Sequence, residues 1–212
     1  MHYLTEKLWF PKPEDATVDG LLAIGGDLSI DRLLLAYNSG IFPWFEDDQP
    51  ILWWGPDPRM VLFPAKFKVS KSLRKTLNSE KFKITFNQNF AEVISNCANV
   101  PRKGETGTWI TEEMQEAYIA MHKAGHAVSV EVWENDKLVG GLYGIDLPQK
   151  KVFCGESMFS LVSDASKVAF YHLSEYSKTK NYKLIDCQIY IEHLESLGAE
   201  EIGREEFLIL LS

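Results

Sequence analysis

From residue 66 onward, the chain alternates between hydrophobic patterns of helical period and hydrophobic patterns of strand period. Ser70 and Thr111 stand just before two of the helical patterns, where a side-chain oxygen can cap the first turn. Gly125 follows the second of these patterns and is typical of a helix end. The predicted helices cover residues 70–78, 90–97, 111–124, 164–178, 192–197 and 204–210. The predicted strands cover residues 81–86, 127–133, 137–145, 151–157 and 182–188, with turns at 134–136 and 148–149.

Residues 1–63 differ in composition from the rest of the chain, because they contain six of the nine prolines and four of the six tryptophans. One helix is predicted here, over residues 31–39, with Ser29 as its cap and Gly40 as its stop. The rest is predicted to form loops and short strands packed by aromatic side chains, including a strand over residues 59–63. The change in composition and hydrophobic pattern predicts a small, aromatic-rich N-terminal domain, residues 1–64, and a larger domain, residues 65–212.

The larger domain contains three predicted strands, then a helix, then a further strand. This order after a helical lead-in predicts an α+β fold, with a mixed α/β sheet and helices on its faces. By analogy, the order also resembles the N-acetyltransferase (GNAT) arrangement, so the domain is expected to be GNAT-like.

The composition is that of an ordinary globular protein, with 45% hydrophobic and 25% charged residues among 212. No apolar run approaches the ~20 residues needed to span a bilayer, and the first residues lack the pattern of a secretion signal. Cys97, Cys154 and Cys187 are widely spaced and odd in number, which is typical of reduced thiols. These features predict a soluble, cytoplasmic protein.

The net charge of −8, taken alone, argues against a nucleic-acid partner. Residues 66–83, however, contain seven Lys or Arg residues and one acid, Glu80, so this segment carries +6 and the rest carries −14. Such a basic island can contact a phosphate backbone while the remainder of the surface avoids non-specific binding. The alternative is a solvated helix face followed by an edge strand with protective lysines.

Several motifs that would carry cofactor or covalent chemistry are incomplete. Phe159 stands where a nucleophile elbow beginning at Gly155 needs its second glycine. The glycines within residues 140–144 lack the Lys-Ser/Thr of a P-loop, so they are expected to let a strand approach a ligand or neighbour closely. No dinucleotide fingerprint occurs, and the two histidines four residues apart lack the further ligands of a zinc site. The sequence predicts neither a metal nor a cofactor.

Acidic and amide side chains stand at the ends of two apolar strand patterns. Asp186 and Gln188 are two residues apart, which on a regular strand places them on the same face. A carboxylate beside an amide can orient an amine and accept its proton. Glu156 ends another apolar strand, where an acid is costly unless it is paired or functional. Each acid could accept backbone hydrogen bonds instead, but two at neighbouring strand ends favour a site.

Trp44 and Trp109 lie in Gly- or Pro-containing connections rather than in predicted elements. An indole on a loop near a basic island can stack on an unpaired base, an interaction of about 1–3 kcal/mol. Packing against the sheet is an equally good interpretation of Trp109. Trp53 and Trp54, in a Pro-rich loop, are expected to belong to the core of the small domain.

Ten short segments, in their order along the chain, together resemble bacterial leucyl/phenylalanyl-tRNA–protein transferases. No single segment is decisive, but the joint match is specific and runs from about residue 20 to residue 210. The segments are GLLAIGGDL (20–28), GIFPWF (40–45), WWGPDPR (53–59), GTWIT (107–111), SVEVW (129–133), LVGGLYG (138–144), GESMFS (155–160), ASK (165–167), DCQ (186–188) and SLGA (196–199).

The resemblance implies transfer of Leu, Phe or Met from aminoacyl-tRNA to the N-terminal amine of a protein that begins with Arg or Lys. The new terminus would mark that protein for degradation by the N-end rule. Attack of an amine on an ester runs without ATP and needs positioning, a proton acceptor and charge stabilisation, rather than a metal or a covalent nucleophile. The expected enzyme is a cytoplasmic monomer that requires no coenzyme A, because the Arg-x-x-Gly-x-Gly loop of GNAT enzymes is missing before residue 164.

The resemblance also implies roles for individual residues. Asp186 and Gln188 would orient and deprotonate the attacking amine, and Glu156 would hold the amine or the terminal adenosine. The adenine would pack on Trp44 and Trp109, with Tyr37 nearby. The walls of the amino-acid pocket would be Leu142, Met158, Phe170 and Ile185, and the contacts to the tRNA backbone would be Lys71, Arg74 and Lys75.

The chain departs from the family pattern at three places. Val128 replaces a frequent histidine, Leu161 replaces a frequent basic residue, and the C-terminal tail is shorter than in many members. Two other functions stay open from the residues alone: a GNAT acyltransferase that uses acetyl-CoA, and a non-enzymatic module that binds a tRNA end or a peptide.

Overall fold

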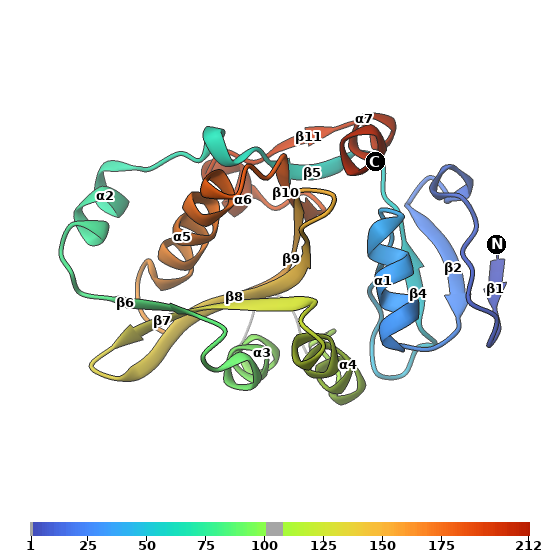
Figure 1. The fold of residues 1–212 in the computed structure, drawn as a ribbon, viewed down its shortest axis with the longest axis horizontal. Coiled ribbons are helices and arrows are strands. Elements are labelled where there is room, and N and C mark those ends of the chain that lie inside the picture. The colour runs from blue at the N-terminus through green and yellow to red at the C-terminus, as the bar shows by residue number, and fades with distance from the viewer. Residues whose placement is uncertain (1, 101–107) are drawn as a thin grey trace.

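The computed structural model describes residues 2–100 and 108–212, which form two sheets with helices around them (Figure 1). The smaller sheet has the strand order β1-β2-β4-β3, with α1 beside it. Its elements are β1 (His2–Leu4), the 3-10 helix η1 (Pro13–Asp15), β2 (Leu21–Gly25), α1 (Ile30–Asn38), β3 (Phe42–Pro43) and β4 (Leu52–Trp54).

The larger sheet has the strand order β11-β5-β10-β9-β8-β7-β6 and is mixed, since β9 and β10 pair in parallel while the other neighbours are antiparallel. Its strands are β5 (Arg59–Leu62), β6 (Lys83–Phe86), β7 (Ala127–Glu134), β8 (Lys137–Leu147), β9 (Val152–Ser160), β10 (Leu184–Gln188) and β11 (Glu200–Ile202). Helix α5 (Ala165–Thr179) covers one face, and α3 (Phe90–Asn99) and α4 (Glu112–Lys123) cover the other (Figure 1). The remaining elements are η2 (Pro64–Lys66), α2 (Lys71–Leu77), α6 (Glu192–Ser196) and α7 (Arg204–Leu211).

The predicted α+β class is confirmed, and β7, β8, β9, α5 and β10 follow one another in the predicted order. Ser29, Ser70 and Thr111 cap α1, α2 and α4 through their side-chain oxygens, as expected. The positions of five short strands were not predicted, because strands of two to five residues show too little alternation: β1, β2, β3, β4 and β11. Within the part of the chain that the structure describes, no helix has the length and apolar character needed to cross a bilayer.

The two sheets share a hydrophobic core. The same cluster of buried side chains includes Trp53 of the smaller sheet and Tyr143 of the larger sheet. Strand β5 pairs with β10 and β11, so sheet membership changes between β4 and β5. The division of the chain into residues 1–64 and 65–212 stays a prediction.

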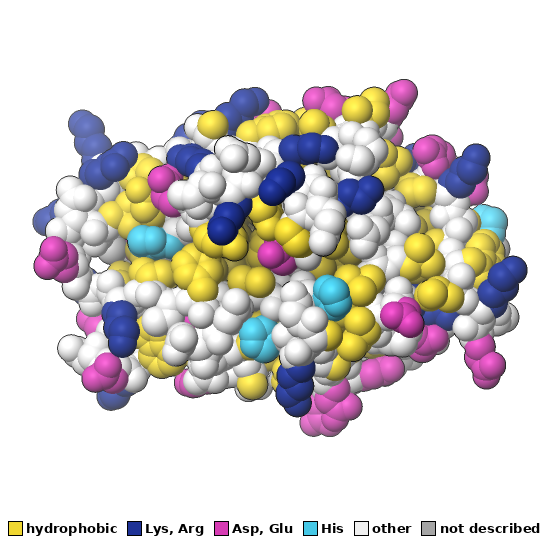
Figure 2. Space-filling view, viewed as in Figure 1, with side chains coloured by type: hydrophobic (Ala, Val, Ile, Leu, Met, Phe, Trp, Pro, Cys, Tyr) yellow, Lys and Arg dark blue, Asp and Glu magenta, His cyan; other side chains and the backbone are white. Residues whose placement is uncertain are grey.

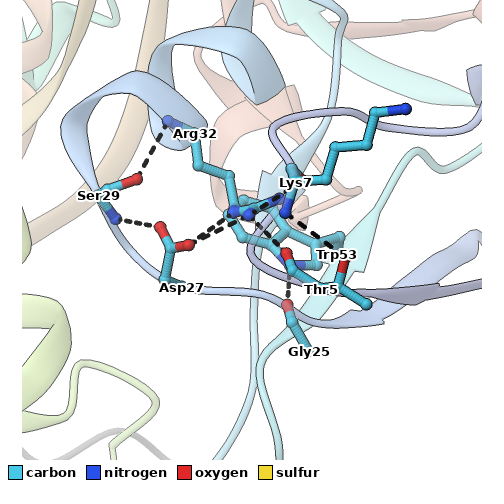
Figure 3. A network of polar contacts seen from close by, with 7 residues as sticks. All are labelled: Thr5, Lys7, Gly25, Asp27, Ser29, Arg32 and Trp53. Carbon is cyan, nitrogen blue, oxygen red and sulfur yellow. Dashed lines mark hydrogen bonds and ion pairs between the residues drawn. The ribbon is translucent and has the colours of Figure 1, made fainter.

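A buried arginine ties the N-terminal segment to α1 within the smaller part of the molecule (Figure 3). Arg32 Nη2 donates hydrogen bonds to the carbonyl oxygens of Thr5 and Lys7, at 2.8 and 3.3 Å. Its Nε and Nη2 also donate to Asp27 Oδ2, at 3.2 and 3.1 Å. Because the Asp27 side chain is half exposed, this ion pair lies at the edge of the core rather than inside it.

The glycines of β8 let its neighbours approach closely, as the sequence predicted. A Cβ atom added to Gly140 would lie 2.5 Å from the Cβ of Ala165, at the start of α5. A Cβ atom added to Gly144 would overlap the carbonyl oxygen of Cys154 and the ring of Phe153 on β9. At Gly140 and Gly144, the backbone of β8 therefore packs so closely against its neighbours that a side chain would collide with them.

Replacing Gly144 by Ala is expected to lower the free energy of unfolding by about 1–3 kcal/mol, because the carbonyl of Cys154 is held in the sheet and cannot move aside. For a protein of this size, each kcal/mol corresponds to about 2–4 °C in Tm. Gly55→Ala is a suitable control, since the nearest atom to an added Cβ there is 3.8 Å away. Equal Tm values for the two variants in thermal unfolding would contradict this packing.

Candidate functional site

A cavity of about 520 Å³ is lined by the smaller sheet, the middle of β8 and β9, the end of β10 and helix α5. Most of its walls are apolar. Each of the four residues predicted to form the amino-acid pocket lines it, namely Leu142 on β8, Met158 on β9, Phe170 on α5 and Ile185 on β10. Phe42, Pro43 and Trp44 close it from the smaller sheet. Figure 2 shows one face of the molecule, where a band of hydrophobic side chains crosses the middle.

A bulge at the end of β10 brings Gln188 into this cavity. The pairing of β10 with β5 loses its register between Asp186 and Gln188, and Gln188 has a left-handed φ of 65°. The simple alternation expected from the sequence is therefore broken at this point. Gln188 and Cys187 line the cavity, whereas Asp186 lies behind the wall and is 1% exposed.

Glu156, on β9, is the centre of a hydrogen-bonded group at the cavity wall. Gln188 Nε2 donates to Glu156 Oε1 at 2.8 Å, and the Tyr118 hydroxyl donates to Glu156 Oε2 at 3.0 Å. The hydroxyls of Tyr118 and Tyr37 are hydrogen-bonded to each other. The chain of polar contacts thus runs from α1 through α4 and β9 to the end of β10.

The surroundings of Glu156 set its protonation. Burial raises the pKa of this carboxyl to about 7, although hydrogen bonds with Tyr37 and Tyr118 oppose the shift. Burial also raises the pKa of both tyrosine hydroxyls well above the ordinary value, so they stay neutral donors. Near neutral pH, Glu156 can therefore gain or lose a proton, as a general acid or base requires.

Asp186 is held by an arginine rather than by solvent. Arg59 Nε donates to Asp186 Oδ1 at 2.8 Å, and Arg59 Nη2 donates to Oδ2 at 2.6 Å. The backbone N–H of Gln188 also donates to Oδ1, at 2.9 Å. The Asp186 carboxylate is therefore engaged in a buried, bidentate ion pair with Arg59 on β5, and its hydrogen bond to the backbone of Gln188 links this pair to the cavity wall.

Sequence reasoning missed two polar residues of the site. Tyr118 lies within the predicted helix over residues 111–124 but was not singled out as a site residue, and Arg59 appeared only as the first residue of a predicted strand and the last of a family segment. The signal for Tyr118 was its hydroxyl, because a buried tyrosine needs a hydrogen-bond partner. Arg59 gave a similar signal, since a guanidinium among apolar strand residues requires an acid nearby.

Trp44 and Trp109, the two tryptophans predicted to pack on the adenine, both line the cavity. Trp44 is 40% exposed and packs at a tilt against Trp54, with ring centroids 5.8 Å apart. Trp109 lines the cavity and is half-buried. Trp53 is fully buried in the core and Trp54 is half-buried, in agreement with the expected structural role. Tyr37, expected near the adenine, is buried behind the wall, where its hydroxyl is hydrogen-bonded to Tyr118, the residue that donates to Glu156.

The predicted backbone contacts Lys71, Arg74 and Lys75 are all exposed on α2, while Leu73 anchors this helix in the core. In Figure 2, Lys and Arg side chains gather over the upper part of the face, where α2 and β5 lie in Figure 1. Helix α2 does not line the cavity, so any ligand that reaches both must be extended. Among the described residues, no group of three His, Cys, Asp or Glu side chains is arranged to hold a metal ion.

The chain is similar to known transferases along its whole length. Residues 61–212 match the family described as "Leucyl/phenylalanyl-tRNA protein transferase", and residues 26–57 match the N-terminal domain of the same family. Proteins named leucyl/phenylalanyl-tRNA–protein transferase from Flavobacterium johnsoniae and Flavobacterium psychrophilum are 61% and 60% identical over 211 residues, covering 100% of this chain and 99% of each relative. Among solved structures, a GCN5-related N-acetyltransferase from Kribbella flavida overlaps with a TM-score of 0.35 and 10% identity, over 80% of this chain and 60% of that chain. The sequence matches establish that the chain belongs to the leucyl/phenylalanyl-tRNA–protein transferase family.

Proposed function

We propose that the cavity binds the aminoacyl end of an aminoacyl-tRNA, and that Glu156 and Gln188 hold the N-terminal amine of the acceptor protein beside the ester. The observation that carries this proposal is a hydrogen-bonded carboxyl and amide in the wall of a mostly apolar cavity. Family membership supplies the reaction, an aminoacyl transfer from tRNA to a protein. The cavity supplies a place where the ester and the amine can meet out of bulk water.

The chemistry needs a neutral amine and a route for one proton. The amine nitrogen attacks the ester carbonyl carbon, an amide C–N bond forms, and the C–O bond to the ribose oxygen breaks. The nitrogen loses a proton and the ribose oxygen gains one, so the atoms and charges of the reaction balance without ATP. Glu156, whose pKa burial raises to about 7, can take the proton from the amine while Gln188 keeps the carboxyl oriented.

The apolar walls favour donors whose side chain is not branched at Cβ. Leu142, Met158, Phe170 and Ile185 surround the space where the side chain of Leu, Phe or Met fits. Shape in such a pocket separates side chains that differ by one methyl by only about 1–3 kcal/mol. The acceptor is a protein that begins with Arg or Lys, the enzyme acts as a cytoplasmic monomer, and the product is marked for degradation.

The terminal adenine of the tRNA stacks at the cavity mouth, on Trp44 and Trp109. Trp44→Ala is expected to weaken binding of aminoacyl-tRNA by about 1–3 kcal/mol, which corresponds to about 5- to 150-fold in Kd. Titration with labelled Phe-tRNA measures the effect. Trp9→Ala serves as the control, since Trp9 packs near His2, away from the cavity lining. Equal affinities of Trp44→Ala and the wild-type protein would rule out stacking on this indole.

Helix α2 contacts the acceptor-stem phosphates through Lys71, Arg74 and Lys75. Replacing all three by Gln is expected to weaken tRNA binding and to make it less sensitive to salt. The slope of the logarithm of the binding constant against the logarithm of the salt concentration should become shallower by about 0.9 for each phosphate that the variant no longer neutralises. Binding is measured between 50 and 200 mM salt, a range over which a protein with about 6–10 phosphate contacts loses about 10³–10⁵ in affinity. A control variant carries Gln at Lys123 and Lys137, two exposed positions elsewhere. A salt slope equal to that of the wild-type protein would assign α2 a structural role only.

A transfer assay tests the function as a whole. Labelled Phe-tRNA and a peptide that begins with Arg are expected to yield Phe-peptide, without ATP or added metal. The same peptide with labelled acetyl-CoA is expected to stay unmodified. Product from acetyl-CoA and none from Phe-tRNA would replace this proposal by a GNAT acyltransferase. Tight tRNA binding without product in either arm would indicate a binding module.

A further inference from the structure

We propose that Arg59 is the positioning residue that couples the two walls of the cavity, so that the amine-binding end of β10 and the tRNA-facing segment after α1 are held in one fixed arrangement. This inference rests on the function proposed above. Arg59 does not line the cavity and touches neither substrate. Its effect on the reaction is exerted through Asp186 on one side and through Gly40 and Phe42 on the other.

The guanidinium holds the β10 side through two hydrogen bonds to Asp186. Asp186 in turn accepts the backbone N–H of Gln188, at 2.9 Å. This N–H belongs to the residue whose left-handed φ turns its side chain toward Glu156. A non-glycine residue keeps this backbone conformation only where its surroundings stabilise it. Here the Arg59–Asp186 pair stabilises the backbone of Gln188.

The same guanidinium holds the opposite wall. Its remaining nitrogen, Nη1, donates to the carbonyl oxygen of Gly40 at 3.1 Å. Its central carbon lies 4.8 Å from the ring centroid of Phe42, a residue of the cavity wall two positions before Trp44. On another side it lies 4.5 Å from the ring centroid of Phe207, on α7. One buried side chain thus contacts α7 and both walls of the site.

Only arginine can make this set of contacts. The planar guanidinium presents a fork of donors that matches a carboxylate, leaves a further N–H for Gly40, and packs its flat face on aromatic rings. A lysine in its place keeps the charge but offers one compact ammonium. The ammonium can pair with Asp186 or reach the carbonyl of Gly40. It cannot bind both at once, so it cannot fix the position of one cavity wall relative to the other.

Arg59→Lys therefore tests the coupling, with Arg32→Lys as the matched control. Arg32 is equally buried, pairs with an aspartate and donates to backbone carbonyls, but its partners lie in the N-terminal segment and before α1 (Figure 3). The Arg59→Lys protein is expected to show a higher KM for Phe-tRNA and a lower kcat, with kcat/KM reduced about 10²-fold, as for a displacement of about 1 Å at a reacting centre. Arg32→Lys is expected to change either constant by less than about threefold, because the partners of Arg32, namely Thr5, Lys7 and Asp27, do not line the cavity.

Thermal unfolding of both variants, recorded beside the kinetics, separates positioning from folding. A purely structural role lowers kcat in proportion to the unfolded fraction and leaves KM unchanged, and that result would overturn the inference. A second variant, Arg59→Met with Asp186→Leu, removes both charges of the buried pair, a change that proteins often tolerate without loss of stability. It is expected to be folded and impaired by a similar factor. A folded double variant as active as the wild-type protein would also overturn the inference.

The wild-type protein is assayed with Phe-tRNA in the same series. No transfer by the wild-type protein would refute the proposed function itself, whereas normal transfer by the wild-type protein and by Arg59→Lys would refute only the coupling.

Discussion

Replacing Glu156 by Gln is expected to lower kcat for aminoacyl transfer by about 10²–10⁴-fold, the contribution typical of a general base. Gln has nearly the same shape and can still bond to Tyr118 and Gln188, but it cannot take a proton from the amine. Binding of Phe-tRNA is expected to change little, because the apolar walls and the tryptophans are untouched. Single-turnover transfer from labelled Phe-tRNA to an Arg-starting peptide measures the rate directly.

The pH dependence provides the control for this variant. Because burial raises the pKa of Glu156 to about 7, the carboxyl is protonated below that pH and the wild-type rate should rise as pH increases through about 7. The acceptor amine adds its own rise near its pKa of about 7.7–8.0. Glu156→Gln should lose the first rise and keep the second. A variant that retains the wild-type rate and profile would show that Glu156 does not accept the proton.

Replacing Asp186 by Asn is expected to lower the free energy of unfolding by about 3–5 kcal/mol, because it leaves the Arg59 guanidinium buried without its counter-charge. The matched change, Asp27→Asn, is expected to cost less than about 1 kcal/mol. Asp27 is half exposed, and its partner Arg32 keeps its bonds to Thr5 and Lys7. Urea unfolding of the two variants and the wild-type protein gives the comparison.

The rate of the Asp186→Asn protein is informative where the protein is still folded. We expect a loss of about 10²–10⁴-fold, as for removal of a group needed in proton transfer. The family resemblance implied that Asp186 contacts the amine directly. With Asp186 behind the cavity wall, the loss is expected instead through displacement of Gln188. Wild-type stability together with wild-type rate would contradict both the buried pair and its link to the site.

Local signals in the sequence predicted the elements that depend on neighbouring residues. The caps at Ser29, Ser70 and Thr111 were found because a side-chain oxygen bonds to a backbone N–H only three residues away. The β7–β8 hairpin was found because Asn135 and Asp136 tolerate the positive φ values, 50° and 59°, that such a turn requires. The order of the strands and helices in the larger domain followed from these local predictions.

Features that depend on distant residues could not be predicted from hydrophobic patterns. Arg59 and Asp186 are 127 residues apart, and nothing along the chain indicates that β5 enters the larger sheet beside β10. The bulge at Gln188 is equally non-local, since it appears only as a slip in the pairing of two strands. Family resemblance named residues that the structure places in the cavity wall, such as Glu156, Gln188 and Met158, and their roles stay predictions. The partners that hold them came from the structure.

The cavity has one wall from each sheet, and this has a consequence for anyone who would redesign the enzyme. The residues proposed to face the transferred side chain, such as Met158 and Phe170, belong to the larger sheet and its helix α5. The indole proposed to face the nucleotide, that of Trp44, directly follows a strand of the smaller sheet. We expect that substitutions in the larger sheet and α5 can enlarge the pocket for a bulkier or unnatural amino acid without weakening binding of the tRNA. We also expect that changes around Trp44 can adapt the enzyme to a shorter donor, such as an aminoacyl-adenosine.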